Sequence, residues 1–277
     1  MGKLFISADI EGCAAVASPH ALAPDRWEWS AARQWMTREV TAVAEAAFEA
    51  GYEEVIVADS HHNAHNIDPD GLPPNVWLVR SWPRPLLHMQ GVEDPDVTAC
   101  VFLGYHAGSG TRDSILAHSY HGGAFRSVRV NGEACSEGYL NAALAGEFGR
   151  SVVFVSGDQA TVEDARRYAP EAAGFVAKRS IGWRSQMSLP PAQVREQLKA
   201  ALAGALSRPA GPPFKIEGPL DLELEMNTQT AAELLSYLPA VRRDDATTVH
   251  ARFDEVQGLM RFLAFAMLYS PTGLIAL

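Results

Sequence analysis

The chain has 277 residues, of which 47% are apolar, and its formal net charge is −10 at pH 7. This length is sufficient for one large domain, or for a domain and a smaller one, around a sizeable core. The basic residues are dispersed, which argues against a nucleic-acid partner. No segment has the roughly 20 consecutive apolar residues that a membrane span requires.

Strands and helices alternate over the first two-thirds of the chain. Apolar runs predict strands at Leu4–Ala8, Glu54–Ala58 and Thr98–Gly104, and Ser30 and Gly51 are the expected N-cap and stop of a helix between the first two. Further predicted elements are a strand at 75–79, a hairpin at 127–135, a helix from Ser136 to Glu147, a strand in SVVFVSGD and a polar helix ending near Pro170. This alternation predicts an α/β fold with a mostly parallel, doubly wound sheet and helices on both faces.

The pattern changes after about residue 185. A helix is predicted in PPAQVREQLKAALAGAL, and the segment LDLELEM alternates strictly between apolar and acidic residues, as in a strand with one wet face. TTVHARF alternates too, and a helix is expected from about Asp254 to Leu268. We therefore predict an α/β metal-binding catalytic domain over residues 1–185 and a smaller α+β subdomain over residues 186–277.

Metal-type ligands follow three of the predicted strands. Asp9 and Glu11 close the first, His61 closes the second, and His106 closes the Thr98–Gly104 strand. Ligands of an open α/β sheet bind beyond the carboxyl ends of its strands, so these side chains are expected to converge. Glu137, in the first turn of a helix, is expected to place a fifth ligand-type side chain at the same edge of the sheet. Together the three carboxylates and two imidazoles predict a site for divalent metal.

Each of these residues also has an ordinary structural interpretation. A loop histidine is more often solvent-exposed than a ligand, and a carboxylate in a first helical turn, such as Glu137, is favoured by the helix dipole alone. His118 and His121 lie in a Ser-, Tyr- and Gly-containing loop that is typical of both turns and reactive sites. Cys13 and Cys135 are interpreted as small buried residues rather than thiolate ligands.

Several ordered segments resemble the zinc-dependent D-aminopeptidase family: Ser7–Gly12, Asp59–His61, Phe102–Ala107, His118-Ser119, Glu137 with Leu140-Asn141, and Ala177-Lys178. The resemblance implies a cytoplasmic peptidase with two zinc ions per subunit, assembled as a ring-shaped homodecamer. It assigns Asp9, Glu11 and His61 to one ion and Glu11, His106 and Glu137 to the other, with Glu11 bridging. His118 corresponds to the catalytic residue, and Lys178 is expected to help orient the substrate.

The function that follows is a binuclear zinc aminopeptidase. It would release the N-terminal residue of short peptides by a metal-activated water, with a D-residue as one candidate for that position. Two alternatives remain open at this point. One is a metal-dependent hydrolase of another small amide or a phosphate ester, and the other is a non-catalytic metal-binding module, for which His118 would be dispensable.

Two further expectations concern assembly and location. The run Phe262–Leu268 is apolar nearly all round and Gly273–Leu277 adds an apolar tail, which favours burial in a homo-oligomer. The N-terminal segment enters a strand without a signal-peptide pattern, and the chain has only three cysteines. We therefore expect a cytoplasmic protein.

Overall fold

The computed structural model describes residues 2–269 and contains a central parallel sheet of six strands in the order β3-β2-β1-β4-β7-β8. These strands are β1 (Lys3–Ala8), β2 (Glu54–Asp59), β3 (Val76–Val79), β4 (Val97–Leu103), β7 (Ser151–Gly157) and β8 (Ala173–Val176). The chain runs outward from β1 to β3 and then crosses to β4 on the other side of β1. The predicted parallel α/β sheet is confirmed, and its winding changes side between β1 and β4.

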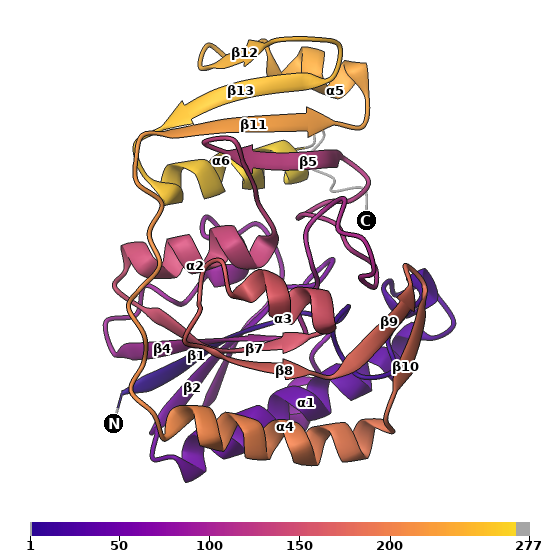
Figure 1. Ribbon diagram of the computed structural model, residues 1–277, viewed down its shortest axis with the longest axis vertical. Coiled ribbons are helices and arrows are strands. Elements are labelled where there is room, and N and C mark those ends of the chain that lie inside the picture. Colours follow the sequence, from indigo (N-terminus) through magenta and orange to yellow (C-terminus); the bar gives the residue numbers. More distant parts are fainter. Residues whose placement is uncertain (1, 270–277) are drawn as a thin grey trace.

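Helices cover both faces of this sheet, as a doubly wound fold requires (Figure 1). On one face lie α1 (Trp29–Glu49) and α4 (Pro191–Leu206), and on the other lie α2 (Glu137–Glu147) and α3 (Gln159–Ala165). Ser136 is the N-cap of α2, as predicted, because its side chain accepts a hydrogen bond from the Tyr139 amide. The N-cap predicted at Ser30 is wrong, because α1 already begins at Trp29 and no side chain caps it.

A second sheet has five antiparallel strands in the order β12-β13-β11-β5-β6. Its strands are β5 (Phe125–Val130), β6 (Glu133–Ala134), β11 (Leu220–Met226), β12 (Val241–Arg243) and β13 (Thr248–Phe253). In β11 the alternation predicted from LDLELEM is confirmed, since every Leu and the Met are buried while Asp221 is exposed. Two helices pack against this sheet, α5 (Gln229–Leu235) and α6 (Val256–Leu268).

The chain does not separate into two independent sheets near residue 185. Strands β5 and β6 come from residues 125–134 yet pair with β11, and α4 packs against α1 rather than in the second sheet. One apolar cluster contains Phe102 of β4, Leu140 of α2, Leu222 of β11 and Leu259 of α6, so both sheets share a core. The boundary predicted from the change of pattern therefore marks a change in strand type and not the edge of a separate core.

A hairpin of β9 (Lys178–Gly182) and β10 (Ser185–Ser188) extends from the end of β8 beside the parallel sheet (Figure 1). The apolar run expected in the last helix lies in α6, where Leu259 and Leu263 are buried and Phe265 is exposed. The tail Gly273–Leu277 lies outside the described residues. Within residues 2–269, no helix has the length and apolar character needed to cross a membrane.

Candidate metal centre

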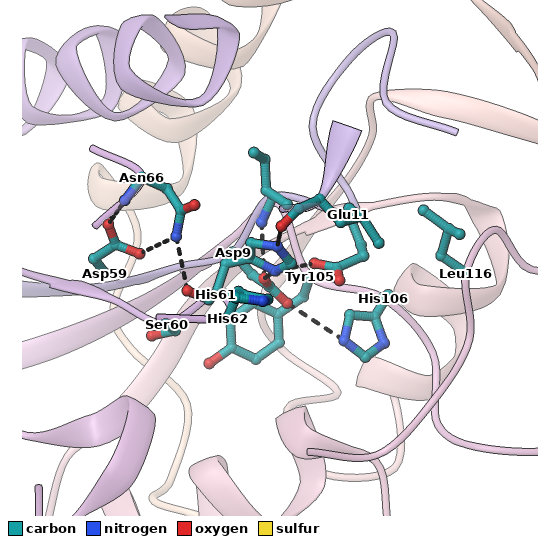
Figure 2. A network of polar contacts seen from close by, with 12 residues as sticks. Asp9, Glu11, Asp59, Ser60, His61, His62, Asn66, Tyr105, His106 and Leu116 are labelled. Atoms are coloured by element: carbon teal, nitrogen blue, oxygen red, sulfur yellow. Dashed lines mark hydrogen bonds and ion pairs between the residues drawn. The ribbon is translucent and has the colours of Figure 1, made fainter. Parts of the chain in front are cut away.

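The loops after β1, β2 and β4 meet where the winding of the sheet changes side. They carry Asp9 and Glu11, His61, and His106, all of them buried, and Glu137 adds a fifth buried side chain as the first residue of α2. Figure 2 shows the side chains of Asp9, Glu11, His61 and His106 gathered together. The predicted convergence at the carboxyl ends of the strands is thus present in the structure.

Two glycines allow the loops after β1 and β4 to touch. The Gly12 amide donates a hydrogen bond to the Gly104 carbonyl at 2.7 Å, and a Cβ on Gly12 would lie 2.1 Å from the Tyr105 carbonyl oxygen. Gly104 has a φ of +68°, a conformation that favours glycine, and a Cβ there would lie 2.3 Å from the Asp9 carbonyl oxygen. This close backbone contact brings Asp9 to His106.

The five side chains form two groups that share Asp9. His61 Nδ1 lies 2.9 Å from Glu11 Oε2 and 3.3 Å from Asp9 Oδ1. On the other side, His106 Nε2 lies 3.3 Å from Asp9 Oδ2 and 3.2 Å from Glu137 Oε1. Asp9, rather than Glu11, thus faces both flanking loops through its two oxygens, because it follows the central strand β1. The bridging role that the resemblance assigns to Glu11 stays a prediction.

The orientation of the imidazoles is the one that metal ligands adopt. His61 Nε2 lies 2.7 Å from the Leu22 carbonyl oxygen, and His106 Nδ1 lies 3.0 Å from that of Ala107. A carbonyl can only accept, so these nitrogens carry hydrogens and the opposite nitrogens face the carboxylates. Metal-binding histidines characteristically donate their outer N–H to such a partner, which fixes the tautomer and the ring.

Burial makes the charges of this cluster interdependent. Burial and the adjacent Glu11 carboxylate raise the pKa of Asp9. Burial also raises the pKa of Glu11, but the neighbouring imidazoles of His61 and His106 outweigh it and hold that pKa well below its usual range. Burial lowers the pKa of His106, yet the carboxylates of Glu137 and Asp9 raise it to about 10. Protonated imidazoles thus balance the carboxylates when no cation does so.

A divalent cation fits this environment better than protons do. Glu11 Oε2 is buried, and although His61 Nδ1 lies 2.9 Å away, it makes no aligned hydrogen bond within residues 2–269. Leaving a charged oxygen in that state is costly unless a cation pairs with it. The mixture of imidazole nitrogen and carboxylate oxygen suits zinc, whereas magnesium prefers oxygen ligands alone.

His118 lies beside the second group. Its ring stacks on that of His106 at a centroid distance of 4.1 Å, and its Nε2 lies 3.7 Å from Glu137 Oε1. Its Nδ1 donates to the Leu116 carbonyl at 2.8 Å, which leaves Nε2 as the free nitrogen of the neutral ring. Burial and the His106 imidazole lower the pKa of His118, so this nitrogen is available to accept a proton.

His88 was not predicted to belong to the site. It lies in the short 3₁₀ helix Leu87–Met89, is buried, and places Nδ1 3.1 Å from Glu137 Oε2. The surrounding sequence, PRPLLHMQG, shows neither a strand nor a helix pattern. The apolar neighbours on both sides of His88 were the one signal of a buried histidine.

Lys178 does not lie where substrate orientation requires. Its side chain is buried, and its ammonium group donates to the backbone carbonyls of Glu11, Cys13 and Val16. Burial lowers the pKa of Lys178 to about 8. Lys178 does not line the cavity over the cluster, so its contacts give it a role in holding the loop that carries Glu11.

A cavity of about 900 Å³ opens above the cluster. Five of the residues that line it are Asp9, Glu11, His61, His118 and Glu137. Its lining also includes His62, Trp82, His121, Arg126 and Trp183. Its apolar and imidazole surfaces, with polar groups gathered at one place, are typical of a small-molecule site. The metal-type ligands thus face a space large enough for a peptide of a few residues.

Comparison with known proteins agrees with this geometry. The model of peptidase family M55, described as D-aminopeptidase, matches residues 2–265. A D-aminopeptidase of Bacillus subtilis (strain 168) is 28% identical over 251 residues, which are 89% of each chain. The solved structure of the Zn-dependent D-aminopeptidase DppA from Bacillus subtilis, described as a self-compartmentalizing protease, has a TM-score of 0.88 at 26% identity and is matched over 97% of this chain and 100% of that one. The chain belongs to the D-aminopeptidase family.

Proposed function

We propose that this protein is a zinc-dependent D-aminopeptidase that uses two ions per subunit to release the N-terminal residue of short peptides. The observation that carries the proposal is a pair of ligand groups that line a cavity in a chain of the D-aminopeptidase family. One group is Asp9, Glu11 and His61, and the other is His106, Glu137 and the adjacent His118. Asp9 lies 3.3 Å from both His61 and His106 and so connects the two groups. Asp9, Glu11 and His61 would hold one ion. Asp9, His106 and Glu137 would hold the other.

Bound zinc would supply Lewis-acid polarisation of the scissile carbonyl and a more acidic water. The chain provides the remaining steps. His118 Nε2 points toward Glu137, so it can accept a proton at the reacting centre and return it to the leaving amine. The hydrogen bond from Nδ1 to Leu116 keeps the ring in the tautomer that this transfer needs.

The cavity favours peptides over phosphate esters. Phosphate ester hydrolysis usually relies on an arginine or lysine that clamps the phosphoryl oxygens. Among the described residues that line the cavity, Arg126 is the one with such a group, and its side chain is 72% exposed and lies 3.6 Å from Glu225. Within residues 2–269, no other arginine or lysine lines the cavity to clamp a phosphoryl group.

Removal and return of metal tests the proposal. Treatment with a strong chelator is expected to abolish peptide hydrolysis, because the carbonyl is no longer polarised. Added zinc is expected to restore hydrolysis as the metal content rises to about two ions per chain, measured by elemental analysis. Hydrolysis that is indifferent to the chelator, or fewer than about one ion per chain after reconstitution, would contradict it.

We also propose that the protein forms a homo-oligomer, specifically a ring of ten. The β9–β10 hairpin exposes large apolar side chains, with Ile181 71% and Met187 60% exposed, and Trp183 of the same hairpin also lines the cavity. Such a surface is typical of a protein interface, and the Bacillus subtilis relative is described as self-compartmentalizing. Light scattering is expected to give about ten times the chain mass of 30.0 kDa, and a mass near one chain would contradict assembly.

The cytoplasm is the location that we propose. Cys13, Cys100 and Cys135 are all buried and free. Unpaired thiols are normal in a reducing compartment and uncommon in secreted proteins. Cell fractionation that places the protein outside the cytoplasm would contradict this location.

A further inference from the structure

His88 is held in one place by rings and by a buried polar network. Its imidazole lies between those of two aromatic side chains, with centroid distances of 5.8 Å to Trp82 and 5.2 Å to Tyr120. Its backbone carbonyl accepts hydrogen bonds from Ser7 Oγ at 3.0 Å and from Ser60 Oγ at 3.3 Å. Neither the ring nor the backbone of His88 is therefore free to move independently of the strand ends.

The same network reaches the helix that carries Glu137. Tyr105 donates its hydroxyl hydrogen to Ser7 Oγ at 2.7 Å, and Asn141 Nδ2 donates to the Tyr105 hydroxyl at 2.8 Å. Asn141 lies four residues after Glu137 in α2, on the same side of the helix. A chain of buried hydrogen bonds thus connects the backbone of His88 to α2, the helix that begins with Glu137.

The two oxygens of Glu137 have different surroundings. Oε1 faces His106 Nε2 and accepts a hydrogen bond from the Tyr120 amide at 2.7 Å. Oε2 faces His88 Nδ1 at 3.1 Å. That nitrogen is buried and has no aligned hydrogen bond within residues 2–269, so the acceptor within reach is Oε2.

His88 lacks the arrangement that marks His61 and His106 as ligands. Each of those rings turns one nitrogen to the carboxylates and donates through the other to a backbone carbonyl. His88 faces Glu137 through Nδ1. Within residues 2–269, no backbone carbonyl accepts a hydrogen bond from its other ring nitrogen, Nε2. His88 Nδ1 lies within hydrogen-bond distance of Oε2, so it can donate to this ligand.

We propose that His88 is a positioning residue for the metal ligand Glu137. Its Nδ1–H donates to Oε2 of Glu137. This contact keeps Oε2 turned away from the ion held with His106 and presents Oε1 to that ion. This inference rests on the proposed two-ion site and deepens it. Partners of this kind orient a ligand and raise its affinity for metal, and their loss typically weakens binding roughly 10- to 100-fold.

Two substitutions separate the donor from the ring. His88→Phe keeps a ring between Trp82 and Tyr120 but removes the nitrogen, whereas His88→Asn loses the ring and keeps an amide donor near the position of Nδ1. Titration against a competing chelator is expected to show that the Phe variant binds one of its two ions roughly 10- to 100-fold more weakly. The other ion should bind as in the wild type, and the Asn variant should recover most of the loss.

A matched control is His65→Asn, because His65 is exposed and contacts Arg80 outside the cluster. It is expected to bind both ions as the wild type does, and circular dichroism should show that all three variants are folded. Wild-type affinity for both ions in the Phe variant would overturn the inference, and so would equal losses in the Phe and Asn variants. A wild-type protein that binds fewer than two ions would instead count against the proposed two-ion site.

Discussion

Asp9→Asn is expected to weaken the binding of both metal ions, whereas Glu11→Gln is expected to weaken the binding of one. Asp9 offers Oδ1 to the group with His61 and Oδ2 to the group with His106, so replacing one oxygen by an amide nitrogen removes the shared ligand. Glu11 contacts His61 within the first group. Both changes are nearly isosteric, so any difference between them reflects coordination rather than volume. Peptide hydrolysis by Asp9→Asn is expected to fall roughly 10³-fold or more.

Elemental analysis after zinc reconstitution and dialysis distinguishes the two roles. The Asp9 variant should retain less than about one ion per chain, and the Glu11 variant should retain about one. If Glu11→Gln lost both ions while Asp9→Asn lost one, the bridging ligand would be Glu11. Equal retention of both ions by the two variants would remove both residues from the metal centre.

His118→Ala is expected to retain both ions and to lower turnover roughly 10²-fold or more. The ring is held by Leu116 with its free nitrogen toward the reacting centre, so its removal deletes a proton carrier and leaves the ligands of both groups in place. Steady-state kinetics and metal content are measured on the same preparation. His250→Ala, in β13 of the second sheet, is the matched control and should match the wild type in both.

Two other outcomes for His118→Ala would change the account. A loss of one ion together with the loss of activity would make His118 a ligand of the second group. Its Nε2 lies 3.7 Å from Glu137 Oε1, close enough for such a role. Unchanged turnover would make it structural, and a non-catalytic metal-binding module would then gain support.

The sequence predicted the positions that strand ends determine. Asp9, His61 and His106 each follow a continuous apolar run, and parallel strands place their carboxyl ends at one rim whatever their separation in the chain. Glu137 was predictable because Ser136 is a good N-cap, which puts the next residue at the start of a helix. These inferences needed periodicity and capping, which are local properties of the chain.

The contacts that depend on irregular backbone were not predictable in this way. Asp9 and Glu11 are two residues apart, and which of them faces both His61 and His106 depends on how the loop turns against Gly104. His88 reaches Glu137 from a short 3₁₀ helix without a sequence pattern. Lys178 follows an apolar run in the same manner as the predicted metal ligands, but its ammonium group donates to backbone carbonyls.

Long-range strand pairing explains the difference in domain organisation. The hairpin over residues 127–135 was predicted, and Asn131 and Gly132 both have the positive φ that its turn needs. The sequence did not show that β5 pairs with β11, some 90 residues later. A local pattern identifies a strand, whereas its partner is selected by packing across the whole fold.

The most direct test of the proposed function is a comparison of zinc-loaded protein on matched dipeptides that differ in the configuration of their N-terminal residue. The release of free amino acid is measured for the D- and L-forms at equal concentration, with and without chelator. We expect release from the D-form that the chelator abolishes, with slower or no release from the L-form. Release from the L-form alone, or no release from either form by protein that holds two ions, would contradict it.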